Sequence, residues 1–401
     1  MTPAADVESA RAVRLGEFYS SMRHGTAVPC SRTLPKSGWL YRMPRRYWAV
    51  LIFVPLIFLA SLLTYLTWFA YTAEELRDRE QSVSFDLSTY SPSYLINQAN
   101  VCSIFSGNKW PAEGATGPAL SILLYVHSRP GHFARRTFLR QAWLHPRFAD
   151  GENYSIRSVF IVGKAHDPSG SIQKKLQEES TQYHDLIQGD FVDVYENLTI
   201  KEAAALAWAD THCSSASFVV KADDDTIIKP WALTETIRRH FDVQDIIRQP
   251  AFLCKVYRYE EPHRNPRKKY FTPRSQYAQD VFPVHCGGAL RITTSSTVSL
   301  LLQSFVKAPY LWLENVFFTG VVAKLIGASH SHEDYLLRDT DDFSIGYAYF
   351  TRRHSPWVAL HAHNLKLVRQ IWTDIMANTP EHFQDGLDKR LPQQHDKEDN
   401  E

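Results

Sequence analysis

The sequence predicts an α/β fold for the larger, C-terminal part of the chain. Apolar runs of the kind that form buried strands occur at 119–126, 158–163 and 218–220. Segments with helical spacing separate these runs, and this alternation is typical of α/β proteins. Three adjacent carboxylates follow the third run at 223–225. Because α/β proteins place ligand sites at the carboxyl ends of their strands, this position is the first candidate for a functional site.

A membrane anchor is predicted near the N-terminus. No charged residue occurs from Tyr47 to Ala73, and this stretch exceeds the roughly 20 residues that span a bilayer. Basic residues precede it and acidic residues predominate after it, so the positive-inside rule places the N-terminus in the cytosol. We therefore predict a single-pass type II membrane protein. The net charge of +1 gives no reason to expect a nucleic-acid partner.

Composition divides the chain into five parts. Residues 1–46 are predicted to form a cytosolic tail, and 47–73 the transmembrane signal anchor. Residues 74–117 are rich in Ser, Asn, Pro and Gly and are interpreted as a luminal stem. The globular domain is expected at 118–380. Residues 381–401, which are charged and rich in Gln, are predicted to be a disordered tail.

The predicted luminal part carries features of a secreted protein. Four of the five cysteines lie in it, where disulfides form, and they allow three pairings: Cys102, Cys213, Cys254 and Cys286. Glycosylation sequons begin at Asn153 and Asn197.

Helices are expected between and after the strands. A capping box at 199–202 opens an Ala-rich helix that leads into the third strand. Further helices are predicted at 133–143, 172–179, 231–241 and 295–305, and a fourth strand at 252–257. The first of these helices carries Arg135, Arg136 and Arg140. They form either a cationic rim for a diphosphate or a solvated basic face, and their spacing alone favours neither.

The acidic triplet Asp223, Asp224 and Asp225 is a candidate metal site. Three adjacent negative charges at the end of a buried strand repel one another unless a positive charge lies there. Hard oxygen ligands suit Mg²⁺ or Mn²⁺. An isolated acidic triplet is more often a solvated turn, so the rest of the chain must decide.

Several blocks in order resemble one family. The blocks are RRTFLRQAW at 135–143, FIVG at 160–163, QGDFVDVYENLTIKEAAALAW at 188–208, HCSSASFVVKADDDTIIKP at 212–230, FPVHCGG at 282–288 and LENVFFTG at 313–320. Through them the chain resembles the β-1,3-galactosyltransferase family of inverting hexosyltransferases, glycosyltransferase family 31, over roughly residues 118–335.

This resemblance implies a GT-A-type, Rossmann-like nucleotide-binding sandwich behind the transmembrane helix and stem. It also implies a UDP-sugar donor, Mn²⁺ as the divalent metal, and β1,3 transfer of galactose or an N-acetylhexosamine to a glycan acceptor on a glycoprotein or glycolipid. The expected location is the Golgi membrane, with the catalytic domain in the lumen.

Matching positions assign expected roles. Asp225 would ligate the metal, while Asp223 and Asp224 would contact ribose, bound water or the sugar. Donor binding is further expected from Lys221, Arg136, Arg140 and Gly288. A metal held by one carboxylate and a diphosphate needs a further ligand. His330 and His332 are the candidates for it, with surface positions as the alternative.

The chain departs from the family pattern at its expected general base. Inversion in one displacement needs a base that takes the proton of the acceptor hydroxyl. The resemblance gives this role to the Asp of an EDV motif, but here Asn315 stands in that place, and an amide cannot accept the proton. Loss of a general base typically costs about 10²–10⁴-fold in rate.

Several explanations of this departure remain open. Glu314 is one replacement base, and Glu333 or Asp334 is another. We expect an active transferase. The alternatives are a weak or inactive relative that binds glycans or nucleotide sugars in the Golgi, and a plain type II receptor. Leu290 and Arg291 replace a Gly and an aromatic residue of the family pattern, which leaves the sugar open.

Overall fold

The computed structural model describes residues 45–81, 89–106, 120–151, 153–241, 249–339, 349–352 and 354–379. The chain divides into two compact units, Met1–Thr72 and Ala73–Glu401. The predicted cytosolic tail lies outside the described residues except for its last two positions, and the predicted tail at 381–401 lies wholly outside them. The predicted domain boundaries as a whole stay predictions.

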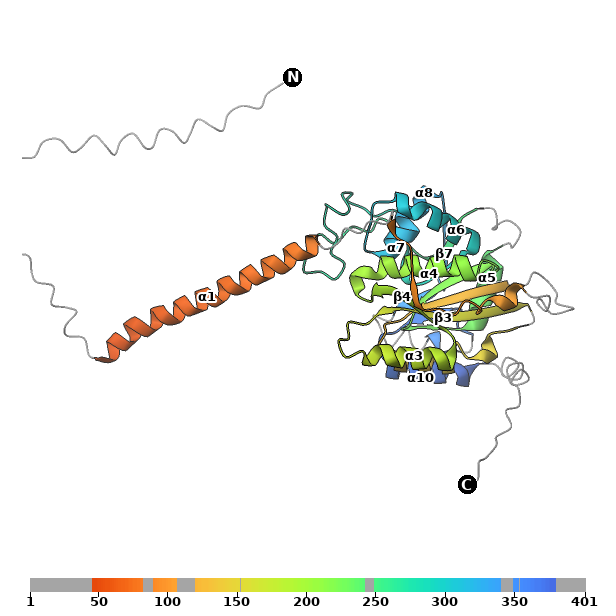
Figure 1. Cartoon of the computed structure of the whole chain (residues 1–401), viewed down its shortest axis with the longest axis horizontal. Helices are drawn as coiled ribbons and strands as arrows, with labels where there is room; N and C mark the ends of the chain where they lie inside the picture. The colour runs from red at the N-terminus through yellow and green to blue at the C-terminus, as the bar shows by residue number, and fades with distance from the viewer. Residues whose placement is uncertain are drawn as a thin grey trace, which may run out of the picture. The chain divides into compact units, whose positions relative to one another are not determined.

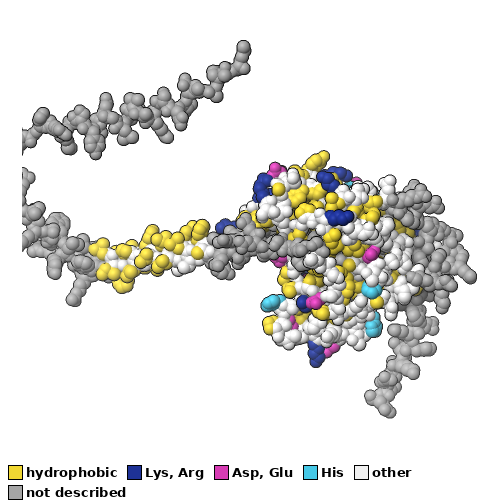
Figure 2. Space-filling model, turned by 45° about the horizontal axis from the view of Figure 1, so that its top comes forward, with side chains coloured by type: hydrophobic (Ala, Val, Ile, Leu, Met, Phe, Trp, Pro, Cys, Tyr) yellow, Lys and Arg dark blue, Asp and Glu magenta, His cyan; other side chains and the backbone are white. Residues whose placement is uncertain are grey.

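Helix α1, Arg45–Gln81, contains the predicted anchor. Its segment Val50–Ala70 is long and apolar enough to cross a membrane, and none of it is buried. Figure 2 shows hydrophobic side chains along this segment. An unburied apolar helix of this length is suited to a lipid environment.

The globular unit is built on a mixed sheet, which confirms the predicted α/β fold. Among the described residues it has the order β1-β4-β3-β2-β5-β8-β7-β9. Its strands are β1 Tyr94–Ile96, β2 Leu120–His127, β3 Tyr154–Lys164, β4 Leu186–Val192, β5 Phe218–Asp223, β7 Ala251–Tyr257, β8 His285–Thr294 and β9 Ser329–His332. Strands β4, β3, β2 and β5 run parallel, and β8 is antiparallel to both β5 and β7. The parallel strands are apolar because both of their faces are covered.

A small second sheet forms beside the acidic triplet. It has the order β10-β11-β6, from β6 Thr226–Ile228, β10 Leu337–Asp339 and β11 Ala359–His361. Strand β6 starts directly after Asp225, and β11 pairs with it antiparallel, with His361 opposite Thr226. This pairing brings the segment around position 361 to the end of β5.

Helices cover both faces of the main sheet. The described helices are α2 Phe133–Gln141, α3 Ser171–Tyr183, α4 Leu198–His212, α5 Pro230–His240, α6 Ser295–Ser304, α7 Glu314–Val316, α8 Ala323–Leu325 and α10 Leu365–Asn378. A π-helical turn, Phe317–Val322, joins α7 to α8, and a 3-10 turn, Tyr195–Asn197, precedes α4. Figure 1 shows α4, α6 and α7 on one side of the sheet and α3 and α10 on the other.

The predicted capping box at 199–202 is wrong. Helix α4 already starts at Leu198, so Thr199 and Glu202 lie inside it. The Thr199 hydroxyl is buried and donates to the carbonyl of Leu311 at 2.7 Å. Glu202 is fully buried and pairs with Arg291. Tertiary contacts therefore use the side chains that the motif would place at the helix end.

Part of the segment that composition assigns to the stem packs against the globular unit. Strand β1 pairs antiparallel with β4. The indole of Trp208 donates to Asn97 at 2.7 Å, and the Tyr94 hydroxyl donates to the carbonyl of Ala204 at 2.8 Å. Of the three possible pairings, the cysteines form Cys102–Cys213 and Cys254–Cys286. The first bridge ties this segment to the end of α4.

Candidate active site

The candidate site lies at the carboxyl end of β5, the fifth strand in the order of the main sheet. Lys221 is buried there, and its ammonium donates to Asp223 at 2.6 Å and to the carbonyl of Gly288. The same ammonium lies 3.4 Å from Glu314. Burial alone would lower the pKa of Lys221, but Asp223 and Glu314 raise it above its usual value. The charged lysine thus gathers three other predicted site residues around one point.

Asp224 has other partners. Its carboxylate is buried, and it accepts a hydrogen bond from the Ser128 hydroxyl at 2.7 Å. The His132 Nδ1 lies 2.7 Å from the same oxygen. Both partners belong to the segment that follows β2, so Asp224 ties that segment to the site.

Asp225 forms a cluster with two histidines. Its Oδ1 lies 3.1 Å from His361 Nε2, and its Oδ2 lies 3.0 Å from His363 Nδ1. Burial alone would raise the pKa of Asp225, but the hydrogen bonds and charges of both histidines lower it well below its usual value. We call Asp225, His361 and His363 the metal-type group, because one ligand atom from each lies within 4.8 Å of the others.

The donor set of the metal-type group fits a divalent transition metal. One carboxylate and two imidazoles combine hard oxygen with borderline nitrogen, a mixture that Mn²⁺ and its neighbours accept. The side chain of His363 is 79% exposed, whereas that of Asp225 is 21% exposed. Solvent, and therefore a phosphate oxygen, has access from the His363 side.

The two histidines that the sequence indicated lie elsewhere. His330 Nε2 contacts the carbonyl of Thr319, and its ring stacks on Phe252 at 5.5 Å. His332 accepts from the backbone of Val256 at 2.9 Å and pairs with Asp334 at 3.0 Å. Both belong to β9, at the outer edge of the main sheet, so the structure does not bring them to Asp225.

His361 and His363 were missed by the sequence reasoning, although a signal exists. An apolar run, Val358 to Leu360, ends in His361-Ala-His363. Polar residues at the end of a buried strand are the pattern that singled out the acidic triplet. No local feature reveals, however, that β11 pairs with β6.

Two of the predicted donor-binding arginines are held by internal carboxylates. Arg136 is fully buried and donates to Glu179 at 2.8 and 2.7 Å. Arg140 donates to Asp185 at 2.7 and 2.8 Å and pairs with Glu179 at 2.8 Å. A buried cation needs a partner of opposite charge, and these carboxylates supply it. Both arginines therefore have a structural role, and the structure does not bring them to Asp225. Arg135 of the same helix lies at the site instead, where it donates to the carbonyl of His363.

A buried charge network lies next to Lys221. Its members are Tyr125, His127, Glu202, Arg291 and Glu314, and all five are buried. Arg291 pairs with Glu202 and lies 3.4 Å from Glu314. The Tyr125 hydroxyl donates to Glu202 at 2.6 Å, and His127 lies 3.1 Å from it. Burial alone would raise the pKa of Glu202, but Arg291 and the hydrogen bonds lower it.

The three candidate bases differ in their surroundings. Glu314 contacts Lys221 and Arg291. Glu333 is engaged by Arg239 at 3.1 Å and by His240 at 2.9 Å, both on α5. Asp334 is 83% exposed and pairs with His332. Of these three carboxylates, only Glu314 therefore contacts Lys221 at the carboxyl end of β5, because the partner of Asp334 lies on β9 at the edge of the sheet.

Asn315, the neighbour of Glu314, has a different partner. Its side-chain amide donates to the carbonyl of Cys286 at 3.2 Å. This contact ties α7 to the start of β8, and it uses the hydrogen-bonding capacity that a carboxylate at this position would lack.

The two sequons differ in their surroundings. The Asn197 amide donates to the carbonyl of Val192 at 2.9 Å, and Thr199 of the same sequon is fully buried. Asn153 is half-buried at the start of β3. Glycosylation at either position stays a prediction.

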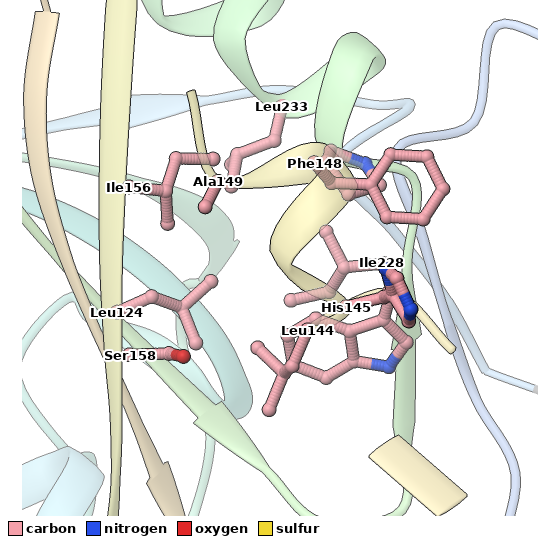
Figure 3. A pocket seen from close by; sticks show the side chains of 11 residues that line it. Leu124, Leu144, His145, Phe148, Ala149, Ile156, Ser158, Ile228 and Leu233 are labelled. Carbon is pink, nitrogen blue, oxygen red and sulfur yellow. The ribbon is translucent and has the colours of Figure 1, made fainter. Parts of the chain in front are cut away.

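An apolar cavity elsewhere in the domain is not part of this site. Leu124, Phe148, Ile156 and Leu233 are among the residues that line it (Figure 3). Its volume of about 20 Å³ leaves room for little more than one water. We interpret it as a packing gap between the sheet and α5.

Comparison with known proteins covers the part of the chain that carries this site. The Galactosyltransferase family model matches residues 134–334. This match covers half of the chain, and it includes β5, the acidic triplet and α7. The chain belongs to the Galactosyltransferase family.

Three human relatives illustrate the match. The chain is 27% identical to Beta-1,3-galactosyltransferase 9 of Homo sapiens, over 61% of this chain and 60% of that protein. It is 27% identical to Lactosylceramide 1,3-N-acetyl-beta-D-glucosaminyltransferase of Homo sapiens, over 60% of this chain and 67% of that protein. It is 31% identical to Beta-1,3-galactosyltransferase 5 of Homo sapiens, over 49% of this chain and 60% of that protein. The chain thus spans about 60% of the length of these two galactosyltransferases.

Proposed function

We propose that the protein is an inverting β-1,3-hexosyltransferase. It moves galactose or an N-acetylhexosamine from a UDP-sugar to a glycan acceptor on a glycoprotein or glycolipid. Its place is the Golgi membrane, with one span and a luminal catalytic domain. The observation that carries the proposal is the metal-type group, which lies at the end of β5 beside Lys221, Asp223 and Glu314.

The donor side of the reaction belongs to the acidic triplet and the histidines of β11. Asp225, His361 and His363 would hold the divalent metal, which offsets the negative charge of the diphosphate as UDP leaves. Asp223 and Asp224 face ribose, bound water or the sugar. Lys221 holds Asp223 in position, and its charge balances Asp223 and Glu314.

The acceptor side belongs to Glu314. In a single displacement the acceptor hydroxyl attacks the anomeric carbon from the face opposite UDP. The bond to UDP breaks as the new bond forms, and a base takes the hydroxyl proton. Glu314 is the carboxylate with contacts to other site residues, and Lys221 and Arg291 fix its position. Asn315 holds the start of β8 and takes no proton.

A second candidate function rests on Asn315. Without a carboxylate at this position, the protein would bind a nucleotide sugar or glycan without efficient transfer. The two functions share the donor site and differ only in turnover, so one experiment addresses both.

The test starts with metal-dependent UDP binding by the full-length chain in detergent. Isothermal titration with UDP and Mn²⁺ should give binding that chelation of the metal abolishes. Asp225→Asn and the His361→Ala, His363→Ala double variant should each weaken it at least about tenfold, since each removes metal ligands. The His330→Ala, His332→Ala double variant is the matched control and should bind UDP like the wild type.

UDP release with a panel of sugar donors and glycan acceptors then decides between the two functions. Turnover with any pair supports the transferase. UDP binding without turnover supports the binding protein. If UDP binding neither depends on the metal nor weakens in Asp225→Asn, the assignment of the donor site is wrong.

A further inference from the structure

A basic loop lies next to the candidate site and has no role in the chemistry above. Residues 258–274, between β7 and β8, contain six Lys or Arg and only two Glu, whereas the whole chain carries a net charge of +1. Within the described part of the chain, four of these cations are exposed and have no carboxylate partner: Arg258, Arg267, Lys268 and Lys269. Exposed charges usually form a solvated face, so the surroundings of this loop must decide.

Backbone contacts hold the loop in a fixed shape. Arg264 donates to the carbonyls of Thr272 and Tyr277, both at 2.8 Å. The indole of Trp312 donates to the carbonyl of Phe271 at 3.0 Å. Trp312 stands two residues before Glu314, so the loop is attached directly to the segment that carries the candidate base.

Lys269 lies over two tyrosine rings. Its ammonium is 4.6 Å from the ring centroid of Tyr195 and 5.1 Å from that of Tyr270. The two rings are 6.3 Å apart, and Trp312 meets Tyr195 edge-on at 5.5 Å. Tyr270 is 43% exposed. This arrangement offers an apolar surface for the C–H face of a sugar, with a cation at its border.

Tyr195 connects this surface to the reacting groups. Burial raises the pKa of Tyr195, the neighbouring Tyr270 raises it next, and the negative charges of Glu314 and Asp223 add to this. The ring of Tyr195 also meets that of Trp312 edge-on, and Trp312 stands two residues before Glu314. The tyrosine pair therefore borders the acceptor side of the site.

We infer that the acceptor glycan carries an acidic group next to the sugar that is extended. The sugar rests on Tyr195 and Tyr270, and Lys269 pairs with a carboxylate, sulfate or phosphate on it. Arg267 and Lys268 add to the positive potential that attracts such an acceptor. This inference rests on the proposed function, because it needs an acceptor beside Glu314.

The test compares sugars that differ only in charge. The full-length chain in detergent, with UDP and Mn²⁺ present, is titrated with N-acetyllactosamine and its 6-sulfated form. Parallel pairs compare glucose with glucuronate and galactose with its 6-phosphate as the non-reducing sugar. We expect at least one acidic form to bind about two- to fivefold more tightly than its neutral partner, which is the strength of one partly exposed ion pair. Added salt should reduce this preference.

Variants identify the cation responsible. Lys269→Met keeps the aliphatic stem over the rings and should abolish the preference for the acidic form, whereas Lys269→Glu should reverse it. Lys174→Met is the matched control, because Lys174 is 79% exposed on α3, and it should keep the preference.

The outcomes separate this inference from the proposed function. Equal binding of all acidic and neutral partners, or a preference that survives Lys269→Met, overturns the inference while UDP binding still supports the donor site. Loss of metal-dependent UDP binding in the wild type instead rejects the proposed function.

Discussion

Two charged clusters meet at the carboxyl end of β5, and they differ in burial. The metal-type group is partly open, since the side chain of His363 is 79% exposed and that of Asp225 is 21% exposed. The buried charge network has side chains with at most 8% exposure at Glu202, Arg291 and Glu314. An open group can exchange its partners for a ligand. A buried network must satisfy its own charges, because each unpaired ion costs several kcal/mol.

Glu314 connects the buried charge network with Lys221 and the acidic triplet. It is a member of the buried network through Arg291, and it contacts Lys221, which also holds Asp223. The comparison therefore predicts that the metal-type group controls donor binding, that Arg291 and Glu202 control stability, and that Glu314 controls turnover.

The largest effect is expected from Glu314→Gln. Gln keeps the size of the side chain but cannot take the acceptor proton, so turnover should fall about 10²–10⁴-fold. UDP affinity should stay near that of the wild type, because the donor ligands are intact. Steady-state UDP release and titration with UDP measure the two quantities.

Glu333→Gln is the control for this variant, since Glu333 is paired with Arg239 and His240 on α5. Its turnover should stay within about twofold of the wild type, which is about 0.4 kcal/mol. Full activity of Glu314→Gln would exclude Glu314 as the base, and the departure at Asn315 would again have no explanation.

The second effect concerns the buried network itself. Arg291→Met leaves the buried charge of Glu202 without its arginine partner and leaves Glu314 with Lys221 alone, so it should destabilise the domain by about 3–5 kcal/mol. The double variant with Glu202→Gln should recover part of this loss. Thermal unfolding of the full-length chain in detergent measures both.

Arg274→Met is the matched control, because this arginine is 64% exposed and its partner Asp280 is 78% exposed. It should change stability by less than about 1 kcal/mol. If Arg291→Met lowered the stability as little as Arg274→Met, the buried charge network would not hold Glu314 in place.

The sequence predicted the fold well where the signal is local. The apolar runs at 119–126 and 218–220 are β2 and β5, because a strand covered on both faces must be apolar along its whole length. The acidic triplet at the end of β5 was likewise predicted as a candidate metal site from its position. The family resemblance singled out Asp225 as the ligand, and this residue is the one that lies in the metal-type group.

The rest depends on contacts between distant segments. The partner histidines at 361 and 363 come to Asp225 only through the pairing of β6 with β11. Arg136 and Arg140 match a family motif, but Glu179 and Asp185 from other elements hold them. Residue type and spacing do not reveal whether a cation faces a ligand or a buried carboxylate, because both need the same charge.

A smaller effect on stability is expected from a substitution at Asn315, and the same variant tests whether this position takes part in catalysis. In Asn315→Asp, a carboxylate oxygen replaces the amide that donates to the carbonyl of Cys286. Two acceptors then face each other, so the domain should lose about 1–3 kcal/mol of stability. Turnover should not rise, because Glu314 already supplies the base. Activity more than about tenfold above the wild type would show instead that position 315 is where the proton is taken.

The smallest effect concerns a buried cation that, unlike Arg291, has no carboxylate partner among the described residues. The ammonium of Lys229 lies 4.3 Å from the ring centroid of Phe350, and burial lowers its pKa to about 8 from the ordinary 10.5. Lys229→Met should raise the free energy of unfolding by about 1 kcal/mol at neutral pH, since the cation–π contact offsets only part of the desolvation cost.

The stability difference between the wild type and Lys229→Met depends on pH. Between pH 8 and 10.5 the unfolded chain keeps a proton that the folded protein has released, so the stability of the wild type rises with pH across this window. The advantage of Lys229→Met should therefore be full below pH 8 and should shrink as the pH approaches 10.5. Thermal unfolding of both proteins at about pH 7 and about pH 9.5 measures the difference. If the advantage did not change with pH, the pKa of Lys229 in the folded protein would not be lowered. Lys229 would then be stable as a buried cation without a carboxylate partner among the described residues, in contrast to the paired charges of the buried charge network.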